Sequence, residues 1–375
     1  MTKDAPSEPL LLTPGPLTTA RSVREAMLRD WGSRDEAFIA LNAAVLDRLV
    51  ALANGQGSHV AVPLQGSGTF VVEAMLGTLL PRDGKALVLV NGAYGERIVR
   101  MAGYHGRQVT TIVDPEDRPS DTARLDAALA ADPAITHVVA VHCETTSGIL
   151  NPIERIAEIT ARYGRRLLID AMSAFGALPL DARETPFDAV AASSNKCLEG
   201  VPGMGFAIVR ESALMETAGN APALSLDLHD QHVAMRRTRQ WRFTPPTHVL
   251  AAFHEALRRH EAEGGIEGRG GRYRDNCRIL VEGMRRLGFE TLLPDALQAP
   301  IIVTFKMPRD PRFAFESFYD RLRRRGYVIY PGKLTVAPSF RIGCIGHLAA
   351  PEMEGAVAAV AAVLEEMGVG ETRAA

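Results

Sequence analysis

The chain has 375 residues, 46% hydrophobic and 23% charged, which predicts a folded protein with a large core and excludes disorder as its main state. The formal net charge of -2 excludes a global field that would bind nucleic acid or an anionic membrane surface. No run approaches the roughly 20 apolar residues that span a bilayer, and the N-terminus lacks the apolar core of a signal peptide. The cysteines show neither CxxC nor zinc-finger spacing, so we expect free thiols in a reducing, cytoplasmic setting.

In chain order, an extended, proline-bearing lead precedes residues 22–53, whose apolar positions predict mostly helix. Asn54 and Gly55 supply a stop. Short runs rich in Val, Ile and Leu then alternate with helical stretches, which predicts a mostly parallel sheet covered on both faces. The runs are HVAVPL, ALVLVN, THVVAVH, RRLLID and FDAVAAS, and the stretches between them include GTFVVEAMLGTLL, GERIVRMAGYHG and PIERIAEITARYG.

The pattern changes after a long helical stretch from about residue 247 to 264. A further helical segment leads to the strand-like runs APIIVTFKM, YVIYPG and SFRIGCIG, with helices between and after them. We therefore expect a large α/β domain over residues 15–264 and a smaller α+β domain over residues 265–375, which the N-terminal segment 1–14 joins.

Three features point to chemistry. The first is the turn Ser67-Gly68-Thr69 between a strand and a helix, where glycine, exposed amides and hydroxyls suit a phosphate. The turn lacks the third glycine of a dinucleotide fingerprint and the Gly-Lys-Ser/Thr of a P-loop. A plain helix cap at Ser67 or Thr69 explains it as well.

The second and third features lie at the ends of two successive strands. Asp170 ends the run RRLLID, and Lys196 follows FDAVAASSN. Ligands of doubly wound sheets bind outside the carboxyl ends of the strands, which favours a site over a cap for Asp170 and over a solvent-exposed loop residue for Lys196. A lysine desolvated there has a lowered pKa and becomes nucleophilic toward a carbonyl.

A phosphate cup, a strand-end carboxylate and a strand-end amine are the three groups that pyridoxal 5'-phosphate (PLP) requires. The segment His142-Cys143-Glu144 suggests a metal only weakly, because adjacent residues on a strand point to opposite faces, and we expect no metal.

The sequence resembles the class V aminotransferases, which are fold-type I PLP-dependent enzymes. The resemblance spans nearly the whole chain and is carried by LLLTPGPLTT, LQGSGT, VNGAYGER, HCETTSGILNPI, IDAMSAFG, SSNKCLEGVPG, WRFTPPTH, YVIYPGK and FRIGCIG. It implies a large domain with a seven-stranded, mostly parallel sheet between helices, and a smaller C-terminal domain.

The resemblance also assigns roles. It implies that Lys196 bonds to the cofactor and shuttles a proton, and that Asp170 keeps the pyridine nitrogen protonated. Arg341 receives the acidic group of the substrate, and Thr244 reaches the cofactor phosphate of the neighbouring subunit, which implies a homodimer. Either Tyr94 or His105 lies over the cofactor ring. The remaining implied cofactor-binding residues are Ser67, Gly68, Thr69 and Ser193 at the phosphate, Thr145 or Thr146 near the phenolic oxygen, and Met172.

Within this family, the motifs imply transfer of the amino group of 2-aminoethylphosphonate to pyruvate. An alanine:glyoxylate or serine:pyruvate aminotransferase shares every cofactor residue and is the alternative. A cysteine desulfurase needs a nucleophilic cysteine on a mobile loop, whereas Cys344 lies in a strand-like run. A non-enzymatic protein that keeps the fold without its chemistry is a further alternative. The sequence leaves open whether Arg34 assists a phosphonate or faces water.

Overall fold

The computed structural model describes residues 8–334 and 337–373. Residues 1–7 of the segment that we assign to the small domain, together with 335–336 and 374–375, lie outside the described residues.

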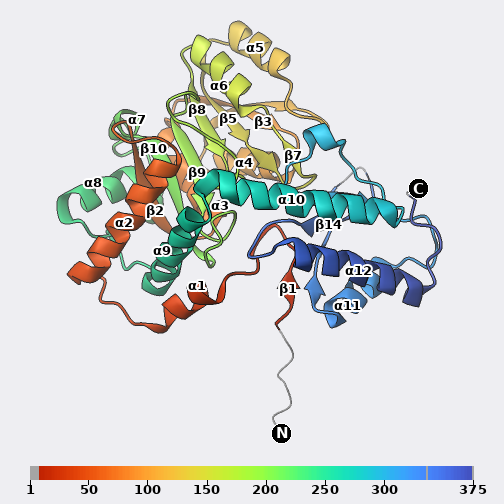
Figure 1. Cartoon of the computed structure of the whole chain (residues 1–375). Helices are drawn as coiled ribbons and strands as arrows, with labels where there is room; N and C mark the ends of the chain where they lie inside the picture. The colour runs from red at the N-terminus through yellow and green to blue at the C-terminus, as the bar shows by residue number, and fades with distance from the viewer. Residues whose placement is uncertain (1–7, 335–336, 374–375) are drawn as a thin grey trace.

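A seven-stranded sheet forms the centre of the larger part of the molecule (Figure 1). Strand β10 runs antiparallel to both of its neighbours, β2 and β9, and the other strands are paired in parallel, which confirms the predicted mostly parallel sheet. In spatial order the strands are β2 (His59–Gly66), β10 (Gly203–Arg210), β9 (Ala189–Ser193), β8 (Arg166–Asp170), β5 (Ile135–Val141), β3 (Lys85–Val90) and β4 (Gln108–Val113).

Helices cover both faces of this sheet, because the inner strands are apolar on both sides. One face packs against α2 (Glu36–Leu52), α5 (Thr122–Ala131), α6 (Ile153–Arg162) and α9 (Thr247–Ala262). The other packs against α3 (Gly68–Leu79), α4 (Ala93–Tyr104), α7 (Glu211–Met215) and α8 (Leu228–Thr238).

The expected helical region 22–53 is interrupted. Helix α1 (Arg21–Glu25) continues into a short 3-10 turn, η1 (Ala26–Leu28), and α2 begins only after residues 29–35. The carboxylate of Asp35 accepts the N–H of Ala37 at 2.9 Å and so caps α2. A short helix, a 3-10 turn and a capped helix of 17 residues therefore make up this mostly helical region.

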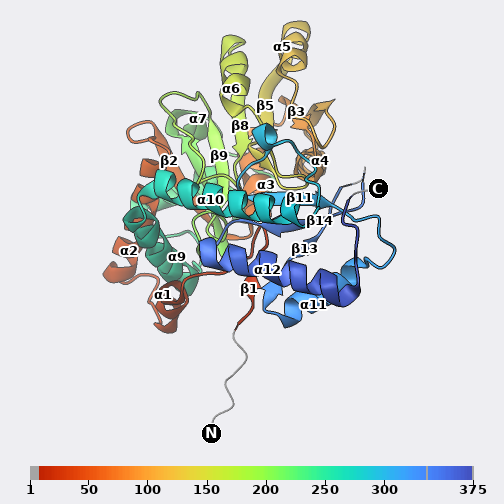
Figure 2. The same cartoon turned by 45° about the vertical axis from the view of Figure 1, so that its right-hand side comes forward.

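The smaller part of the molecule is built on a three-stranded antiparallel sheet of order β11-β14-β13. Helix α10 crosses from the larger part to this sheet, and α12 lies alongside it (Figure 2). Strand β1 pairs in parallel with β12, which places the described part of the N-terminal segment here. The elements are β1 (Leu10–Leu11), α10 (Gly265–Arg286), η3 (Asp295–Leu297), β11 (Ile302–Lys306), α11 (Phe315–Arg324), β12 (Tyr327–Val328), β13 (Tyr330–Pro331), β14 (Ser339–Gly343) and α12 (Ala350–Met367).

The turn between α9 and α10 contains Gly264 and Gly265, with φ of 97° and 68°. Glycine adopts this conformation readily, and it allows the chain to change direction where we expect the domain boundary. The boundary itself stays a prediction.

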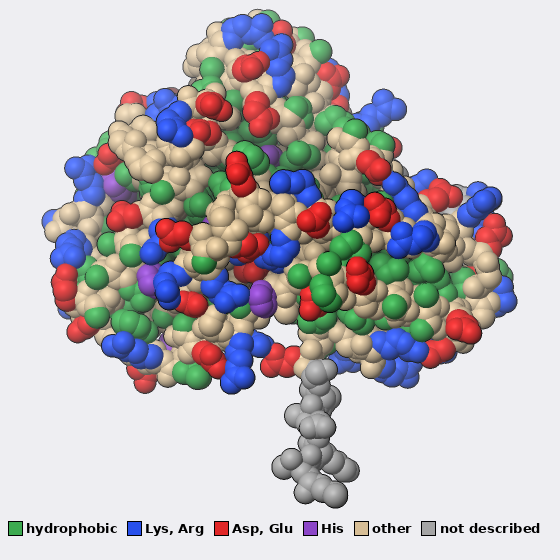
Figure 3. All heavy atoms as spheres, in the orientation of Figure 1, with side chains coloured by type: hydrophobic (Ala, Val, Ile, Leu, Met, Phe, Trp, Pro, Cys, Tyr) green, Lys and Arg blue, Asp and Glu red, His purple; other side chains and the backbone are tan. Residues whose placement is uncertain are grey.

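The visible surface is charged and mixed: Figure 3 shows Lys and Arg side chains interspersed with Asp and Glu over most of this face. Within the described residues, no helix combines the length and apolar character needed to cross a membrane.

Candidate active site

A cavity of about 310 Å³ lies where the carboxyl ends of β2, β8 and β9 meet the N-terminal ends of α3 and α4. This is the edge at which open α/β sheets bind ligands. The structure thus brings together predicted site residues that are far apart in the sequence. Those that line the cavity are Ser67, Gly68, Thr69, Tyr94, Asp170, Met172, Ser193 and Lys196.

Lys196 follows β9 and extends its half-buried side chain toward the N-terminal segment. Its Nζ donates to the carbonyl oxygen of Pro14 at 2.6 Å and to that of Gly15 at 3.4 Å. Burial lowers the pKa of this amine from 10.5 to about 8, and the positive charges of Lys333 and Arg341 act in the same direction. About a tenth of the amine is therefore neutral, and hence nucleophilic, at pH 7.

Gly15 permits the approach of this lysine. A Cβ at Gly15 would lie 2.8 Å from both Cδ and Nζ of Lys196, and the residue has a φ of 111°, which side-chain-bearing residues rarely adopt.

Asp170 ends β8 and is buried. Its carboxylate accepts the N–H of Met172 at 3.0 Å. Burial raises the pKa of Asp170 to about 6, and the buried carboxylate of Glu144 adds to the rise, while Arg97 and Lys196 oppose it. A cationic group in the cavity would favour the ionised form further.

The turn Ser67-Gly68-Thr69 starts α3. Ser67 is the N-cap residue, but its side chain makes no capping hydrogen bond. A Cβ at Gly68 would lie 2.2 Å from Sδ of Met172, so a glycine allows the turn and the residue after Asp170 to enclose one side of the cavity. The free N–H groups and partial positive charge at a helix start suit an anion.

The structure separates the two candidates for the place over the cofactor ring. Tyr94 lies in the first turn of α4 and lines the cavity, whereas His105 is the C-cap of the same helix. A rise of about 1.5 Å per residue puts roughly 16 Å between these positions. His105 instead lies 3.3 Å from Oε1 of Glu73. The geometry therefore favours Tyr94.

Glu144 is a residue that the sequence reasoning considered only as a metal ligand. It is fully buried in a short hairpin, β6 (Cys143–Glu144) with β7 (Ile149–Leu150). Its carboxylate accepts the N–H of Tyr94 at 3.1 Å and of Gly95 at 3.4 Å, at the start of α4. Thr146 donates its hydroxyl to the same carboxylate at 2.6 Å. Glu144 therefore fixes the backbone of Tyr94 beside the cavity.

Thr145 and Thr146 are both buried and do not line the cavity. The carbonyl of Thr145 accepts Nη1 of Arg341 at 2.7 Å, and the N–H of Ala93 donates to Oγ1 of Thr146 at 3.0 Å. Their expected contact with the cofactor stays a prediction.

Arg341 lies on β14, the central strand of the small sheet, and is 1% exposed. Its Nε donates to the carbonyl of Pro331 at 3.1 Å, and no described carboxylate lies within ion-pair distance of it. Burial lowers its pKa. Arg341 and the predicted Thr244 do not line the cavity, and neither does Arg34, whose role the sequence left open; Thr244 and Arg34 are both exposed in the single chain.

A buried ionic cluster directly behind Lys196 went unpredicted. Glu199, at a φ of 55°, accepts Nη2 of Arg272 and the hydroxyl of Tyr273, each at 2.7 Å. Arg269 donates to the carbonyl of Cys197 at 2.5 Å. Arg272 also donates to the carbonyls of Gly346 and Leu348, at 2.6 and 2.7 Å. The cluster links the loop after Lys196 to α10 and to the segment after β14.

Comparison with known proteins agrees with this geometry. The sequence model of the aminotransferase class-V family matches residues 65–343. The chain belongs to the class V aminotransferase family. A 2-aminoethylphosphonate–pyruvate transaminase of Pseudomonas fluorescens is 56% identical over 97% of this chain and 98% of its own length.

Two solved aminotransferase structures are also similar. Pyridoxamine-pyruvate aminotransferase from Mesorhizobium loti has a TM-score of 0.89 at 26% identity, covering 97% of this chain and 94% of that one. Alanine–glyoxylate aminotransferase from Nostoc sp. has a TM-score of 0.87 at 25% identity, covering 97% of each chain. The aminotransferase fold expected from the sequence is therefore confirmed.

The donors of this class V aminotransferase fit the PLP that the family implies. The cavity offers helix-start amides and hydroxyls for a phosphate, a buried carboxylate for a ring nitrogen and a reactive amine for an aldehyde. Gly68 approaches Met172 closely on the side of the cavity suited to the phosphate, and a larger residue at position 68 would fill that space.

Gly15→Ala is expected to impair PLP capture. The new Cβ would collide with Lys196, so we expect the rate at which added PLP produces the visible absorbance band to fall at least about tenfold. The matched control is Gly219→Ala, whose φ is 73° and whose Cβ would meet nothing within 4 Å. Gly219→Ala should cost about 1–2 kcal/mol of unfolding free energy, and Gly15→Ala at least as much because of the collision. Equal capture by the two variants would contradict the role of Gly15.

The pH dependence of PLP capture should reflect the lowered pKa of Lys196. Only the neutral amine attacks a carbonyl, so the capture rate should rise about tenfold per pH unit below pH 8 and level off above it. Stopped-flow absorbance of the PLP-free protein between about pH 6 and 10 measures this, with an alkylamine of ordinary pKa as the control for ionisation of PLP itself. A rate that keeps rising steeply between pH 9 and 10, as for the alkylamine, would refute the assignment.

Proposed function

We propose that this chain is a PLP-dependent transaminase that moves the amino group of 2-aminoethylphosphonate to pyruvate, giving phosphonoacetaldehyde and L-alanine. The main support is the 56% identity over nearly the full length of both chains with a relative named for this reaction. The convergence of Lys196, Asp170 and the Ser67 turn on one cavity supports the chemistry.

When bound, PLP supplies an aldehyde carbon that reacts with amines and a ring that accepts the electron pair released at the substrate carbon. Lys196 would hold PLP through its Nζ. In the first half-reaction Nζ would accept the proton from the amine-bearing carbon of the donor, and in the second it would deliver a proton to the former carbonyl carbon of pyruvate. Asp170 would keep a proton on the ring nitrogen, because its ionised carboxylate favours a neighbouring cation.

Arg341 would bind the acidic group of each substrate. A guanidinium presents parallel N–H donors that match a phosphonate or a carboxylate. Because the donor has no carboxylate on its amine-bearing carbon, one site would accept a phosphonate in the first half-reaction and the carboxylate of pyruvate in the second.

We further propose a homodimer with shared active sites. Thr244 is exposed and its neighbour Phe243 is 48% exposed, while Phe70, beside Thr69, is 50% exposed. Large apolar side chains next to site residues are typical of surfaces that a second chain covers. A cytoplasmic location, which cell fractionation tests, is supported by four buried free thiols.

Amino-donor profiling tests the reaction. We expect the protein to form phosphonoacetaldehyde and alanine in equal amounts, with a kcat/KM for 2-aminoethylphosphonate at least about tenfold above that for serine or alanine with glyoxylate. Initial-rate plots should be parallel, as for a ping-pong enzyme. Lys196→Ala should lose both the absorbance of bound PLP and turnover. Good use of serine or alanine with glyoxylate, and none of 2-aminoethylphosphonate, would establish the alternative activity instead.

Mixing two inactive variants tests the shared sites. Lys196→Ala and Thr244→Ala chains should each show little activity alone. If Thr244 serves the partner's cavity, a hybrid dimer has one fully intact site, so refolding an equal mixture should restore about a quarter of wild-type activity. A residue acting within its own chain leaves no intact site in the hybrid. An absence of recovery with dimers present would therefore refute the shared site.

A further inference from the structure

Three cations lie near Tyr94, which lines the cavity. The guanidinium carbon of Arg97 lies 4.8 Å from the ring centroid, and Nζ of Lys333 lies 5.6 Å from it. The buried guanidinium of Arg341 donates to the carbonyl of Thr145, and the adjacent Thr146 accepts the N–H of Ala93, the residue before Tyr94. The three come from two different parts of the fold, because Arg97 lies on α4 whereas Lys333 and Arg341 lie on or beside the small sheet.

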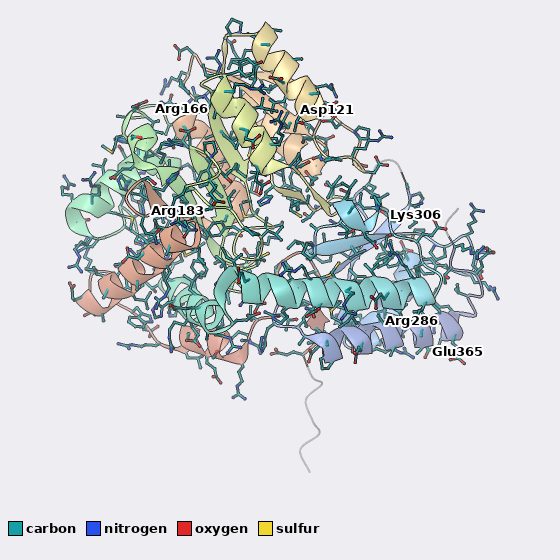
Figure 4. All side chains as sticks on the ribbon, turned by 45° about the horizontal axis from the view of Figure 1, so that its top comes forward. Asp121, Arg166, Arg183, Arg286, Lys306 and Glu365 are labelled. Carbon is teal, nitrogen blue, oxygen red and sulfur yellow. The ribbon has the colours of Figure 1, made fainter. Side chains whose placement is uncertain are left out.

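None of these cations has a described carboxylate within 4 Å, unlike many cations on the surface. Arg166, Arg183 and Lys306, labelled in Figure 4, each form an ion pair with a nearby acidic residue. The nearest buried carboxylates, Asp170 and Glu144, act on Arg97 and Arg341 without forming a close ion pair, and like charges that lack a close partner repel one another. The positive charges of Lys333 and Arg341 also both disfavour protonation of Lys196. An anionic ligand would relieve this repulsion.

The three cations fall into two groups, Arg97 on the side of the phosphate turn and Lys333 with Arg341 on the side of the small sheet. Arg97 lines the cavity and donates to Oγ1 of Thr69 at 3.3 Å, which places it on the side of the phosphate turn. Lys333 and Arg341 do not line this cavity but lie on the side of the small sheet, where the same short segment holds both. The carbonyl of Pro331 accepts Nε of Arg341, and the N–H of Gly332 donates to the carbonyl of Ser339 at 2.9 Å.

The base of the Lys333 side chain is fixed by this packing. A Cβ at Gly332 would lie 2.2 Å from Oγ of Ser339, so glycine is needed for β13 and β14 to remain this close. Lys333 therefore starts at a defined distance from Arg341. Its long, exposed side chain can reach a ligand at the mouth of the cavity.

We propose that Lys333 is the residue that selects a phosphonate over a carboxylate, by adding a second positive charge to the anion site of Arg341. This proposal rests on the proposed function. A phosphonate can carry two negative charges and a carboxylate only one. The single positive charge of Arg341 therefore neutralises the carboxylate of pyruvate but only half of the charge of the donor's phosphonate. Lys333 then acts in one half-reaction and has little effect on the other.

Lys333→Gln tests the proposal through the difference between the two half-reactions. We expect kcat/KM for 2-aminoethylphosphonate to fall about 10- to 100-fold, as for loss of a hydrogen bond between charged groups, and kcat/KM for pyruvate to change less than about threefold. Lys333→Arg should restore most of the loss. The matched control is Lys306→Gln, a half-buried lysine of the same sheet that pairs with Glu290, which should leave both values unchanged.

Two inhibitors without an amine isolate the anion site. Ethylphosphonate and propionate differ in the acidic group. The inhibition constant of each is measured in competition with the amino donor that the wild type uses. Lys333→Gln should weaken ethylphosphonate about 10-fold or more and propionate less than about threefold. An equal effect on both inhibitors, or on neither, would overturn the proposal. Absence of turnover of 2-aminoethylphosphonate by the wild type would overturn the proposed function, whereas selective weakening of ethylphosphonate would still support the role of Lys333.

Discussion

The site depends on shielding the amine of Lys196 from water, so that its neutral, reactive form is populated, while Nζ keeps hydrogen-bond acceptors. A fully buried, unpaired ammonium would be too costly, and a solvated one would keep its ordinary pKa and stay protonated. The structure solves this with two carbonyls from the N-terminal segment, of which Pro14 accepts Nζ at 2.6 Å. Carbonyls stabilise the amine without the strong charge of a carboxylate, so its pKa can fall to about 8.

That arrangement requires the two parts of the molecule to be held together. The Pro14 segment follows β1, which pairs with β12 of the smaller part, whereas Lys196 follows β9 of the central sheet. The cluster of Glu199 and Arg272 supplies the link, because it joins the loop after Lys196 to carbonyls beyond β14. A buried ion pair is often not stabilising compared with apolar packing, but losing one partner is costly, so such a cluster enforces a single arrangement. The cluster fixes the loop after Lys196 in this way, which is a reason for charged side chains rather than apolar ones to be buried there.

The sequence predicted the central residues of the site because these depend on local rules. Asp170 and Lys196 each follow a buried run, and the carboxyl ends of parallel strands meet at one edge of the sheet, so their proximity follows from topology. Glu144, Glu199 and Lys333 obey no such rule. Each acquires its role from a partner distant in sequence, such as the start of α4 for Glu144 or α10 for Glu199. The exact start of α2 could not be predicted, because the cap at Asp35 depends on a hydrogen bond of its side chain that the apolar pattern does not show.

The division of the site between two parts of the fold has a consequence for substrate choice. The groups suited to the cofactor lie on the central sheet and its helices, whereas Arg341 and Lys333 lie on or next to the small sheet. Arg341 nevertheless binds the central part directly through the carbonyl of Thr145, two residues from Ser147, whose own carbonyl accepts the hydroxyl of Thr304 on β11. The cofactor chemistry can therefore stay constant while residues of the small sheet change the accepted acid. A change in substrate preference at Lys333 would therefore require no change in Asp170 or Lys196, the groups that we propose hold and move the proton.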